Sequence, residues 1–189
     1  VYDEYRDFVE VFAAVKCNGK WGFIDTNGKE VIPICYSEVS DFSNGYARAY
    51  YDKVDKHKMN RGRINRLGEH VVFNDDKPFI LPVKYSDGMD FSGGFAPVCY
   101  KDKWGFINTN GDEIIPTKYS SVEQGFTDDF AIVRNQHSGG QIYIDRQGRA
   151  YVKDGDKLIA VPAIYDDYRT FSEGLLAVSL NNKWGFIDM

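Results

Sequence analysis

The residue types that most often carry catalysis are sparse in this sequence, and their spacing matches no catalytic or metal-binding pattern. The histidines and cysteines lie far apart: His57, His70, His137, Cys17, Cys35 and Cys99. None is spaced from another His or Cys as zinc ligands are. The nucleophile motif Gly-x-Ser-x-Gly, the metalloprotease motif His-Glu-x-x-His and a phosphate-binding loop are also missing from the sequence. We therefore expect no catalytic residue, no metal and no cofactor, and the sequence predicts a protein that is not an enzyme.

Clustered aspartates are the remaining candidates for acid–base chemistry. They occur at residues 128–129, 154–156 and 166–167. Each cluster falls where a turn is expected, and aspartate side chains stabilise turns by accepting hydrogen bonds from the backbone two residues on. Paired catalytic carboxylates and simple turn chemistry both remain open, and the positions favour turn chemistry.

One stretch is strongly basic. Residues 53–66 read KVDKHKMNRGRINR, with six Lys and Arg against a single acidic residue, Asp55. A corresponding stretch at residues 134–142, RNQHSGGQI, is mostly uncharged. The basic stretch is either a solvated hairpin tip or a docking loop for an acidic protein surface. Nucleic acid is disfavoured, because the stretch has no aromatic residues that could stack on bases. The candidate partner-binding residues are Lys53, Lys56, His57, Lys58, Arg61, Arg63, Arg66 and His137.

The overall composition narrows the class of protein further. The 189-residue chain is 43% hydrophobic and 15% aromatic, and its formal net charge is −5. An acidic chain is a poor general nucleic-acid binder, because that affinity comes from Lys and Arg neutralising phosphates. Neither a signal peptide nor an apolar run of about 20 residues, the length that spans a membrane, is recognisable. We expect a soluble protein, and the unpaired cysteine pattern favours the cytoplasm, with a disulfide or a reactive thiol as the alternative.

The dominant feature of the sequence is an internal repeat. KWGFID at residues 20–25 returns at 183–188, and KWGFIN occupies 103–108. All three Trp residues lie in these copies, so the repeated structural residues are Trp21, Gly22, Trp104, Gly105, Trp184 and Gly185. The copies at residues 20–25 and 103–108 each continue into a turn containing Asn-Gly, an apolar strand that reaches Pro, then a Tyr and a Phe. A sequence motif that returns several times along one chain predicts an array of similar structural units.

Two further copies lack the Trp. RGRINRLG at 61–68 and QIYIDRQG at 141–148 fit the same frame, with Arg61 and Gln141 in place of Trp. Counted between equivalent alanines, short and long copies alternate. The spacing predicts a doublet present twice, at residues 14–96 and 96–177, with a pseudo-twofold relation, and partial repeats at both ends.

Within each copy the pattern predicts a three-stranded antiparallel meander. Residues 14–17 and 20–25 form two strands joined by a tight turn at Asn18-Gly19, since these residues accept positive φ. Asp25 is expected to cap the next turn with its side chain. Residues 30–32 form the third strand, and Pro33 is expected to stop it, because proline cannot donate to the ladder.

Such a sheet cannot bury its aromatic face alone, and stacking against neighbouring copies would do so. The Trp would supply buried area, and the Gly beside it would let backbone or a ring approach closely. The alternative is that exposed Trp rings form a platform for a ligand. The strand alternation favours the structural interpretation.

These motifs give the chain a family resemblance. It resembles the WG-repeat proteins, also called KWG-repeat proteins, which are common in bacteria. The resemblance covers nearly the whole chain and is weaker in the two copies that lack Trp-Gly. It implies a repetitive β architecture, a role in binding or protein interaction, and no catalytic residues.

We therefore expect an all-β fold of about five meanders in one domain over residues 1–189, as a propeller-like ring or an open array. An open array is favoured, since no third strand follows Asp188. The predicted function is a non-enzymatic protein-interaction module, part of a larger bacterial protein. The alternative is a carbohydrate or small-ligand binding domain that uses aromatic platforms.

Overall fold

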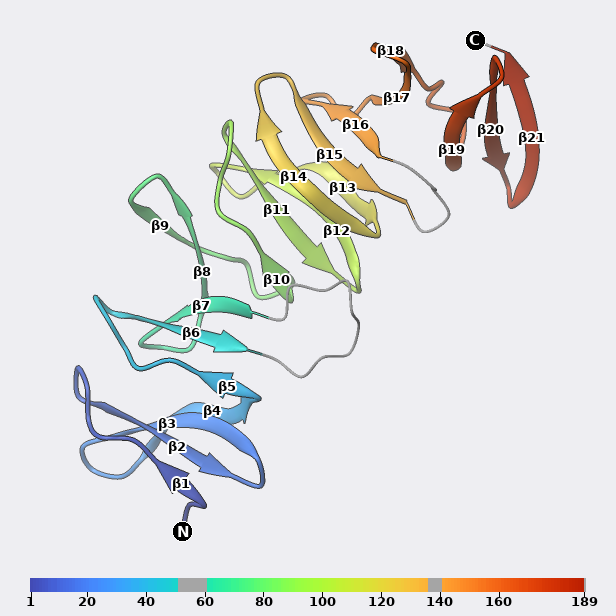
Figure 1. The fold of residues 1–189 in the computed structure, drawn as a ribbon. Helices are drawn as coiled ribbons and strands as arrows, with labels where there is room; N and C mark the ends of the chain where they lie inside the picture. The colour runs from blue at the N-terminus through green and yellow to red at the C-terminus, as the bar shows by residue number, and fades with distance from the viewer. Residues whose placement is uncertain (51–60, 136–140, 189) are drawn as a thin grey trace. The chain divides into compact units, whose positions relative to one another are not determined.

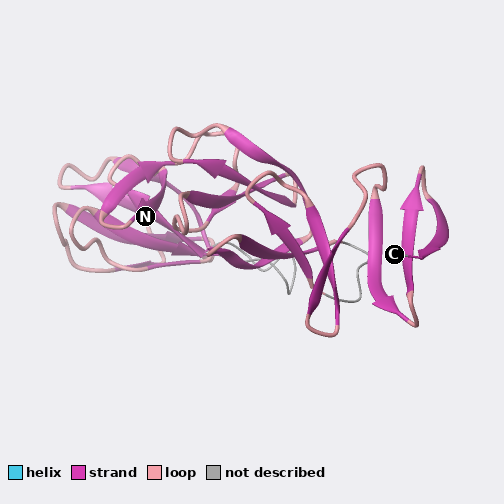
Figure 2. Ribbon diagram, turned by 90° about the horizontal axis from the view of Figure 1, so that it is seen from above, coloured by secondary structure: helices cyan, strands magenta, loops and turns pink. Residues whose placement is uncertain are grey.

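The computed structural model describes residues 1–50, 61–135 and 141–188 (Figure 1). Within these ranges every regular element is a strand, and no helix is drawn in Figure 2. The strands of the described residues form five antiparallel sheets, which confirms the predicted all-β fold and the number of meanders. The chain divides into two compact units, Val1–Met89 and Asp90–Met189. The pseudo-twofold relation stays a prediction.

The first unit holds a four-stranded sheet and then a five-stranded sheet. The first sheet consists of β1 (Glu4–Tyr5), β2 (Phe12–Cys17), β3 (Lys20–Asp25) and β4 (Glu30–Tyr36), in that order. The second consists of β5 (Glu38–Val39), β6 (Tyr46–Tyr50), β7 (Arg61–Asn65), β8 (His70–Asn74) and β9 (Lys77–Ile80). The short strand β10 (Asp87–Gly88) ends the unit.

The second unit repeats this arrangement and adds a smaller sheet. Its first strands are β11 (Phe95–Tyr100), β12 (Lys103–Asn108) and β13 (Glu113–Tyr119). A five-stranded sheet follows, with β14 (Ser121–Thr127), β15 (Phe130–Arg134), β16 (Ile142–Asp145), β17 (Ala150–Asp154) and β18 (Lys157–Ala160). The last sheet is β19 (Asp167–Ser172), β20 (Leu175–Leu180) and β21 (Lys183–Asp188), in which β21 is an edge strand.

Four of the five sheets in the described residues are larger than the predicted three strands. The segment that follows the Tyr of one copy turns back and pairs with the next copy, so that Val39 in β5 lies opposite Ala49 in β6. The copies without Trp-Gly add one more hairpin, β8–β9 or β17–β18. The extra strands explain why those copies are longer.

The third strand of the meander does not stop at proline, which corrects the prediction for Pro33. β4 runs on to Tyr36, and its register against β3 shifts between Trp21, which lies opposite Tyr36, and Phe23, which lies opposite Ile32. The single residue Gly22 of β3 therefore lies opposite three residues of β4, Pro33 to Cys35. Proline is tolerated because a bulge takes residues out of the hydrogen-bonded ladder. β13 has the same shift around Pro116.

The strand register also corrects the repeat frame by one residue. Ala13 pairs with Ile24, and Ala96 pairs with Ile107 at the same position of the motif. The residue equivalent to Ala96 is thus Ala13 rather than Ala14, and in the last copy it is Leu176, which pairs with Ile187. Cys17 and Cys99 consequently occupy different positions of the repeat.

The predicted turn chemistry is confirmed. Asn18 and Gly19 have positive φ values of 51° and 78°. The carboxylate of Asp25 accepts hydrogen bonds from the backbone N–H groups of Asn27 and Lys29, both at 2.9 Å. These local interactions hold the two ends of the KWGFID strand in place.

Each unit has a core in which the aromatic face of one copy packs on the next. In unit 1 the ring of Phe42 lies 4.9 Å from Phe23 and 5.0 Å from Phe12, measured between centroids. In unit 2 Phe126 contacts Phe95 and Phe106 in the same way. Phe42 and Phe126 therefore cover the aromatic face of the strands that precede them, which supports the predicted stacking of neighbouring copies.

Candidate binding surfaces

The predicted basic patch lies largely outside the described residues. Lys53, Lys56, His57 and Lys58 fall in residues 51–60, and His137 falls in residues 136–140. Arg61 is described through its backbone, as the first residue of β7. Their role in binding a partner stays a prediction.

Arg63 and Arg66 are both described, and the structure gives each an intramolecular contact. The Arg63 guanidinium lies 4.2 Å from the centroid of the Phe73 ring, a cation–π contact between neighbouring strands. Arg66 lies in the turn at the far end of β7 from Arg61, and pairs with Glu10 at 3.1 Å. Arg63 and Arg66 therefore contact different parts of unit 1, Phe73 in β8 and Glu10 before β2.

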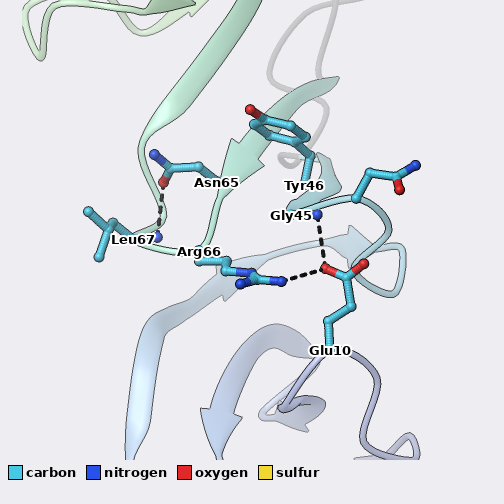
Figure 3. Close-up of a pocket in the computed structure, with 7 residues that line it drawn as sticks. Glu10, Gly45, Tyr46, Asn65, Arg66 and Leu67 are labelled. Carbon is cyan, nitrogen blue, oxygen red and sulfur yellow. Dashed lines mark hydrogen bonds and ion pairs between the residues drawn. The ribbon is translucent and has the colours of Figure 1, made fainter. Parts of the chain in front are cut away.

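The Arg66 turn forms a shallow pocket of about 390 Å³ in unit 1, shown in Figure 3. The same Glu10 oxygen that contacts Arg66 accepts a hydrogen bond from the N–H of Gly45 at 2.9 Å. The Gly45 N–H and then Arg66 lower the pKa of the Glu10 carboxyl. Glu10 precedes β2 and Gly45 precedes β6, so this contact joins the first sheet to the second.

An equivalent contact recurs in unit 2. Arg146 occupies the same position in QIYIDRQG as Arg66 in RGRINRLG. Its guanidinium donates to the carbonyl oxygens of Gly93 and Asp128, each at 2.8 Å. Arginine at this turn thus ties each copy that lacks Trp-Gly to the copy before it. The two arginines could have been recognised from the sequence, since no other copy has Arg at this position. The repeat pattern was defined without them.

The three Trp residues do not share one environment. Trp21 and Trp104 are buried, with 7% and 3% of their surface exposed, whereas Trp184 is 43% exposed. The structural interpretation of Trp-Gly therefore holds for the first two. Arg6 lies over Trp21 and Arg169 over Trp184 at the same distance, 4.7 Å to the ring centroid. Because the arginine contact is the same for both rings, the difference in exposure between Trp21 and Trp184 arises elsewhere around the motif.

The glycine that follows each Trp shows where this difference in exposure arises. A Cβ atom on Gly22 would lie 2.7 Å from the carbonyl oxygen of Ile32, and one on Gly105 would lie 2.7 Å from the backbone nitrogen of Thr117. Both contacts come from the bulge of the third strand. Nothing lies within 4 Å of the same position on Gly185. The edge of β21 is open where β3 and β12 are covered.

The same opening exposes an apolar face. Phe186 is 74% exposed, although its equivalents Phe23 and Phe106 are 1% and 0% exposed. Trp184 shares its side of the strand with Phe186, and Leu175, opposite Asp188 on β20, shares that side too and is 43% exposed. We call Leu175, Trp184 and Phe186 the β21 face.

A polar pocket of about 370 Å³ adjoins Trp184 in unit 2. Its lining residues are Lys103, Lys118, Asn135, Asp166, Asp167, Ser179, Asn182 and Trp184. The Asp167 carboxylate accepts hydrogen bonds from the Asn135 amide and the Tyr168 N–H, both at 2.8 Å. The Asp166 carboxylate accepts one from the Asn181 N–H at 2.7 Å. Asp166 thus contacts the turn between β20 and β21, and Asp167 contacts Asn135 and the start of its own strand.

Two titratable groups in unit 1 are shifted by burial. Burial raises the pKa of Asp87 from 3.8 to about 7, against the hydrogen bond from the Gly88 N–H. Burial lowers the pKa of His70. Among the described residues, no three His, Cys, Asp or Glu side chains lie together as metal ligands would. In the same part of the chain there is no helix with the length and apolarity to cross a membrane.

Comparison with known proteins identifies the family but no close relative. A search of curated proteins found no match. Among solved structures, Kluyveromyces lactis Hsv2 with loop 6CD replaced by a Gly-Ser linker is 11% identical, with a TM-score of 0.33, over 95% of this chain and 59% of that one. The Kluyveromyces lactis Hsv2 with complete loop 6CD is 13% identical, with a TM-score of 0.31, over 95% and 56% of the two chains. Likenesses this weak carry no inference about function, and the chain spans less than two thirds of both structures.

A family model, in contrast, matches the repeat of this chain. The family model described as WG containing repeat matches five segments, at residues 1–21, 21–53, 73–104, 104–136 and 159–184. These matches cover most of the chain, and their ends fall at Trp21, Trp104 and Trp184 among other residues. The chain belongs to the WG containing repeat family.

Proposed function

We propose that this chain is a non-enzymatic protein-interaction module within a larger bacterial protein, and that a polypeptide segment outside residues 1–189 covers the β21 face. The observation that carries this proposal is the contrast between equivalent side chains. Phe186 is 74% exposed, whereas Phe23 and Phe106 are buried by the next copy. A contiguous exposed apolar surface on a folded domain is typical of an interaction site.

The residue types on this face also suit a protein interface. Trp, Tyr and Arg dominate the binding energy of protein interfaces, and here Arg169 lies over the ring of Trp184. Covering one large apolar side chain contributes about 1.5–3 kcal/mol. Phe186 and Trp184 together therefore offer enough apolar area to anchor a partner of moderate affinity.

The basic stretch at residues 53–66 is a proposed second contact. Arg63 and Arg66 already contact Phe73 and Glu10, so a test of this contact should leave them unchanged. Replacing Lys53, Lys56 and Lys58 with Ser should weaken binding to an acidic partner and reduce the salt dependence of that binding. Unaltered affinity and salt dependence would remove the stretch from the proposal.

The main test is affinity capture from a bacterial lysate with the intact chain and two variants. The double variant Trp184→Ser, Phe186→Ser removes the β21 face. Val83→Ser is the matched control, because Val83 is a fully exposed apolar residue of unit 1 and lies outside the sheet that contains β21. We expect a protein captured by the intact chain and the control to be lost from the double variant. Equal capture by all three would contradict docking through this face.

A second candidate function is carbohydrate binding at the pocket beside Trp184. The observation that favours it is the meeting of an exposed indole with amide and carboxylate groups in one pocket of about 370 Å³. Titration with neutral oligosaccharides, followed by Trp fluorescence, tests it. Saturable quenching that Asn182→Ala abolishes would support this candidate, and a flat response across the oligosaccharides would exclude it.

A further inference from the structure

Val11 adopts a backbone conformation that β-branched residues rarely take. Its φ is 68°, and no other β-branched residue in the described part of the chain has a positive φ. It forms a two-residue hairpin turn with Glu10. The counterparts of Val11 in three other copies are Gly45, Gly94 and Gly174, with φ values of 82°, 85° and 80°. Valine at this turn therefore stores strain that glycine avoids.

Packing of the Val11 side chain does not offset this strain, because Val11 is 60% exposed. A Cβ atom on Gly45, Gly94 or Gly174 would also have nothing within 4 Å among the described residues. The side chain at this turn thus points into open space in every one of these copies. Because Gly45 and Gly94 lie well inside the chain, this opening does not depend on the chain ends. Strained residues that persist without a packing role are candidates for a functional site.

A second unusual apolar residue, Leu67, lies in the same pocket as Val11. The pocket has a volume of about 540 Å³ in unit 1, and the partly buried Phe12 and Val31 also line it. Leu67 is 75% exposed. Its counterparts in three other copies are the polar residues Asn27, Asn110 and Gln147. Two copies of the repeat therefore each place an exceptional apolar side chain in one pocket of the size that small molecules occupy.

The pocket also carries one charge of each sign that has no partner among the described residues. Lys29 and Glu30 both line it, and neither side chain forms a hydrogen bond or an ion pair in that part of the chain. The other two charged side chains of the pocket are already engaged. Arg66 pairs with Glu10, and Asp25 accepts hydrogen bonds from the backbone of its own turn. A ligand with one positive and one negative group complements the pair that remains.

We propose that this pocket binds a zwitterionic small molecule with a branched apolar side chain, of the chemical class of the aliphatic α-amino acids. The side chain of the ligand lies between Val11 and Leu67. Its carboxylate accepts from the Lys29 ammonium, and its own ammonium donates to the Glu30 carboxylate. Charged hydrogen bonds fix the head group, and covering exposed apolar side chains provides affinity. The site is separate from the β21 face and goes beyond the proposed function.

Unit 2 lacks this combination of residues. The counterparts of Val11, Leu67 and Lys29 there are Gly94, Gln147 and Asp112. The Asp112 carboxylate accepts a hydrogen bond from the Asn108 amide at 3.0 Å, and its negative charge lies where the carboxylate of the ligand would bind. We therefore expect one ligand per chain, in unit 1.

The test uses L-leucine as the probe and the full 189-residue chain, labelled for amide NMR. Chemical-shift titration gives the dissociation constant and identifies the backbone amides that respond. Isocaproate and isopentylamine are the ligand controls, because each keeps the branched side chain of leucine and loses one of its two charges. Val11→Gly and Leu67→Gln introduce the residues found in unit 2. Val83→Ser is the control variant, because Val83 is a fully exposed apolar residue of unit 1 outside the pocket.

We expect L-leucine to bind saturably to the intact chain and to Val83→Ser, with one site per chain. Binding to Val11→Gly and Leu67→Gln, and binding of either analogue, should be at least about tenfold weaker. The absence of saturable binding, equal binding to either pocket variant, equal binding of an analogue, or responding amides confined to residues away from the pocket would overturn the inference.

The melting temperature of Val11→Gly provides a second readout. Because glycine relieves the strain at this turn, we expect the melting temperature to rise by about 2–4 °C while binding is lost. An unchanged or lower melting temperature would also overturn the inference, because Val11 would then serve the stability of the turn. Lysate capture through Trp184 and Phe186 tests the proposed function independently of these results.

Discussion

Gly22 lies directly against the backbone of Ile32: a Cβ atom on the glycine would be 2.7 Å from the Ile32 carbonyl oxygen. This relationship explains why Trp is followed by Gly in the repeat. The bulge that carries Pro33 needs the space that a side chain would fill. The glycine of the Trp-Gly pair therefore leaves the space in which the proline-bulged strand packs.

The glycine positions predict a graded set of effects on stability. Gly22→Val and Gly105→Val force a side chain into backbone, and each should lower the free energy of unfolding by about 1–3 kcal/mol or more. Gly185→Val meets nothing within 4 Å and should leave stability nearly unchanged. Urea denaturation measures all three. A loss at Gly185 equal to that at Gly105 would mean that the glycine is required by something other than the bulge.

Replacing each Trp should likewise change the stability by different amounts. Trp104 is 3% exposed, and Trp104→Ala should lower the free energy of unfolding by about 3–5 kcal/mol. Trp184 is 43% exposed and stacks with Arg169, so that Trp184→Ala should cost about 1 kcal/mol or less. Thermal unfolding of both variants checks this. Similar losses would contradict the difference in environment.

The arginine turns predict a stabilising contact between neighbouring copies. Arg146 donates to two carbonyl oxygens, and Arg146→Ala should lower the free energy of unfolding by about 1–3 kcal/mol. Arg66 makes a more exposed ion pair with Glu10, so Arg66→Ala should have a smaller effect that weakens as salt is added. Denaturation at low and high salt distinguishes the two. A larger loss for Arg66 would reverse this assignment.

Asp87 predicts a pH dependence of the stability of unit 1. Its carboxyl keeps its proton up to about pH 7 in the folded chain but loses it near 3.8 when unfolded. Its contribution to stability is therefore complete below about pH 4 and is lost as pH rises through 7. Asp87→Asn should remove this loss, raising the free energy of unfolding at pH 8 by about 2–4 kcal/mol.

Unfolding of Asp87→Asn at pH 5 and pH 8 measures that effect. Asp76→Asn is the control, since Asp76 is exposed in a turn of the same unit. If the two variants show the same change between these pH values, the buried position of Asp87 does not govern the titration.

Local features of the fold could be predicted from the sequence because short-range chemistry fixes them. The positive φ at Asn18-Gly19 and the side-chain cap by Asp25 depend on neighbouring residues. The burial of Trp21 and Trp104 followed from the alternation along the strand and from the repeat. These are the features on which an internal repeat gives the most information.

Other features depended on distant partners and could not be predicted. The extension of β4 past Pro33 needs a bulge opposite Gly22, which becomes visible once both strands are placed. The exposure of Trp184 depends on what lies beyond the edge of β21, although its sequence matches that of Trp21. Arg66 belonged to a basic stretch, yet its contact is Glu10, 56 positions away in the sequence.

Acrylamide quenching of Trp fluorescence in the intact chain and in Trp184→Phe tests directly whether the β21 face is exposed. We expect one accessible Trp population beside a protected one in the intact chain, because Trp184 is exposed and Trp21 and Trp104 are buried. In Trp184→Phe the accessible population should disappear. If quenching is unchanged by this substitution, Trp184 is covered in solution, and the β21 face is not an open binding surface.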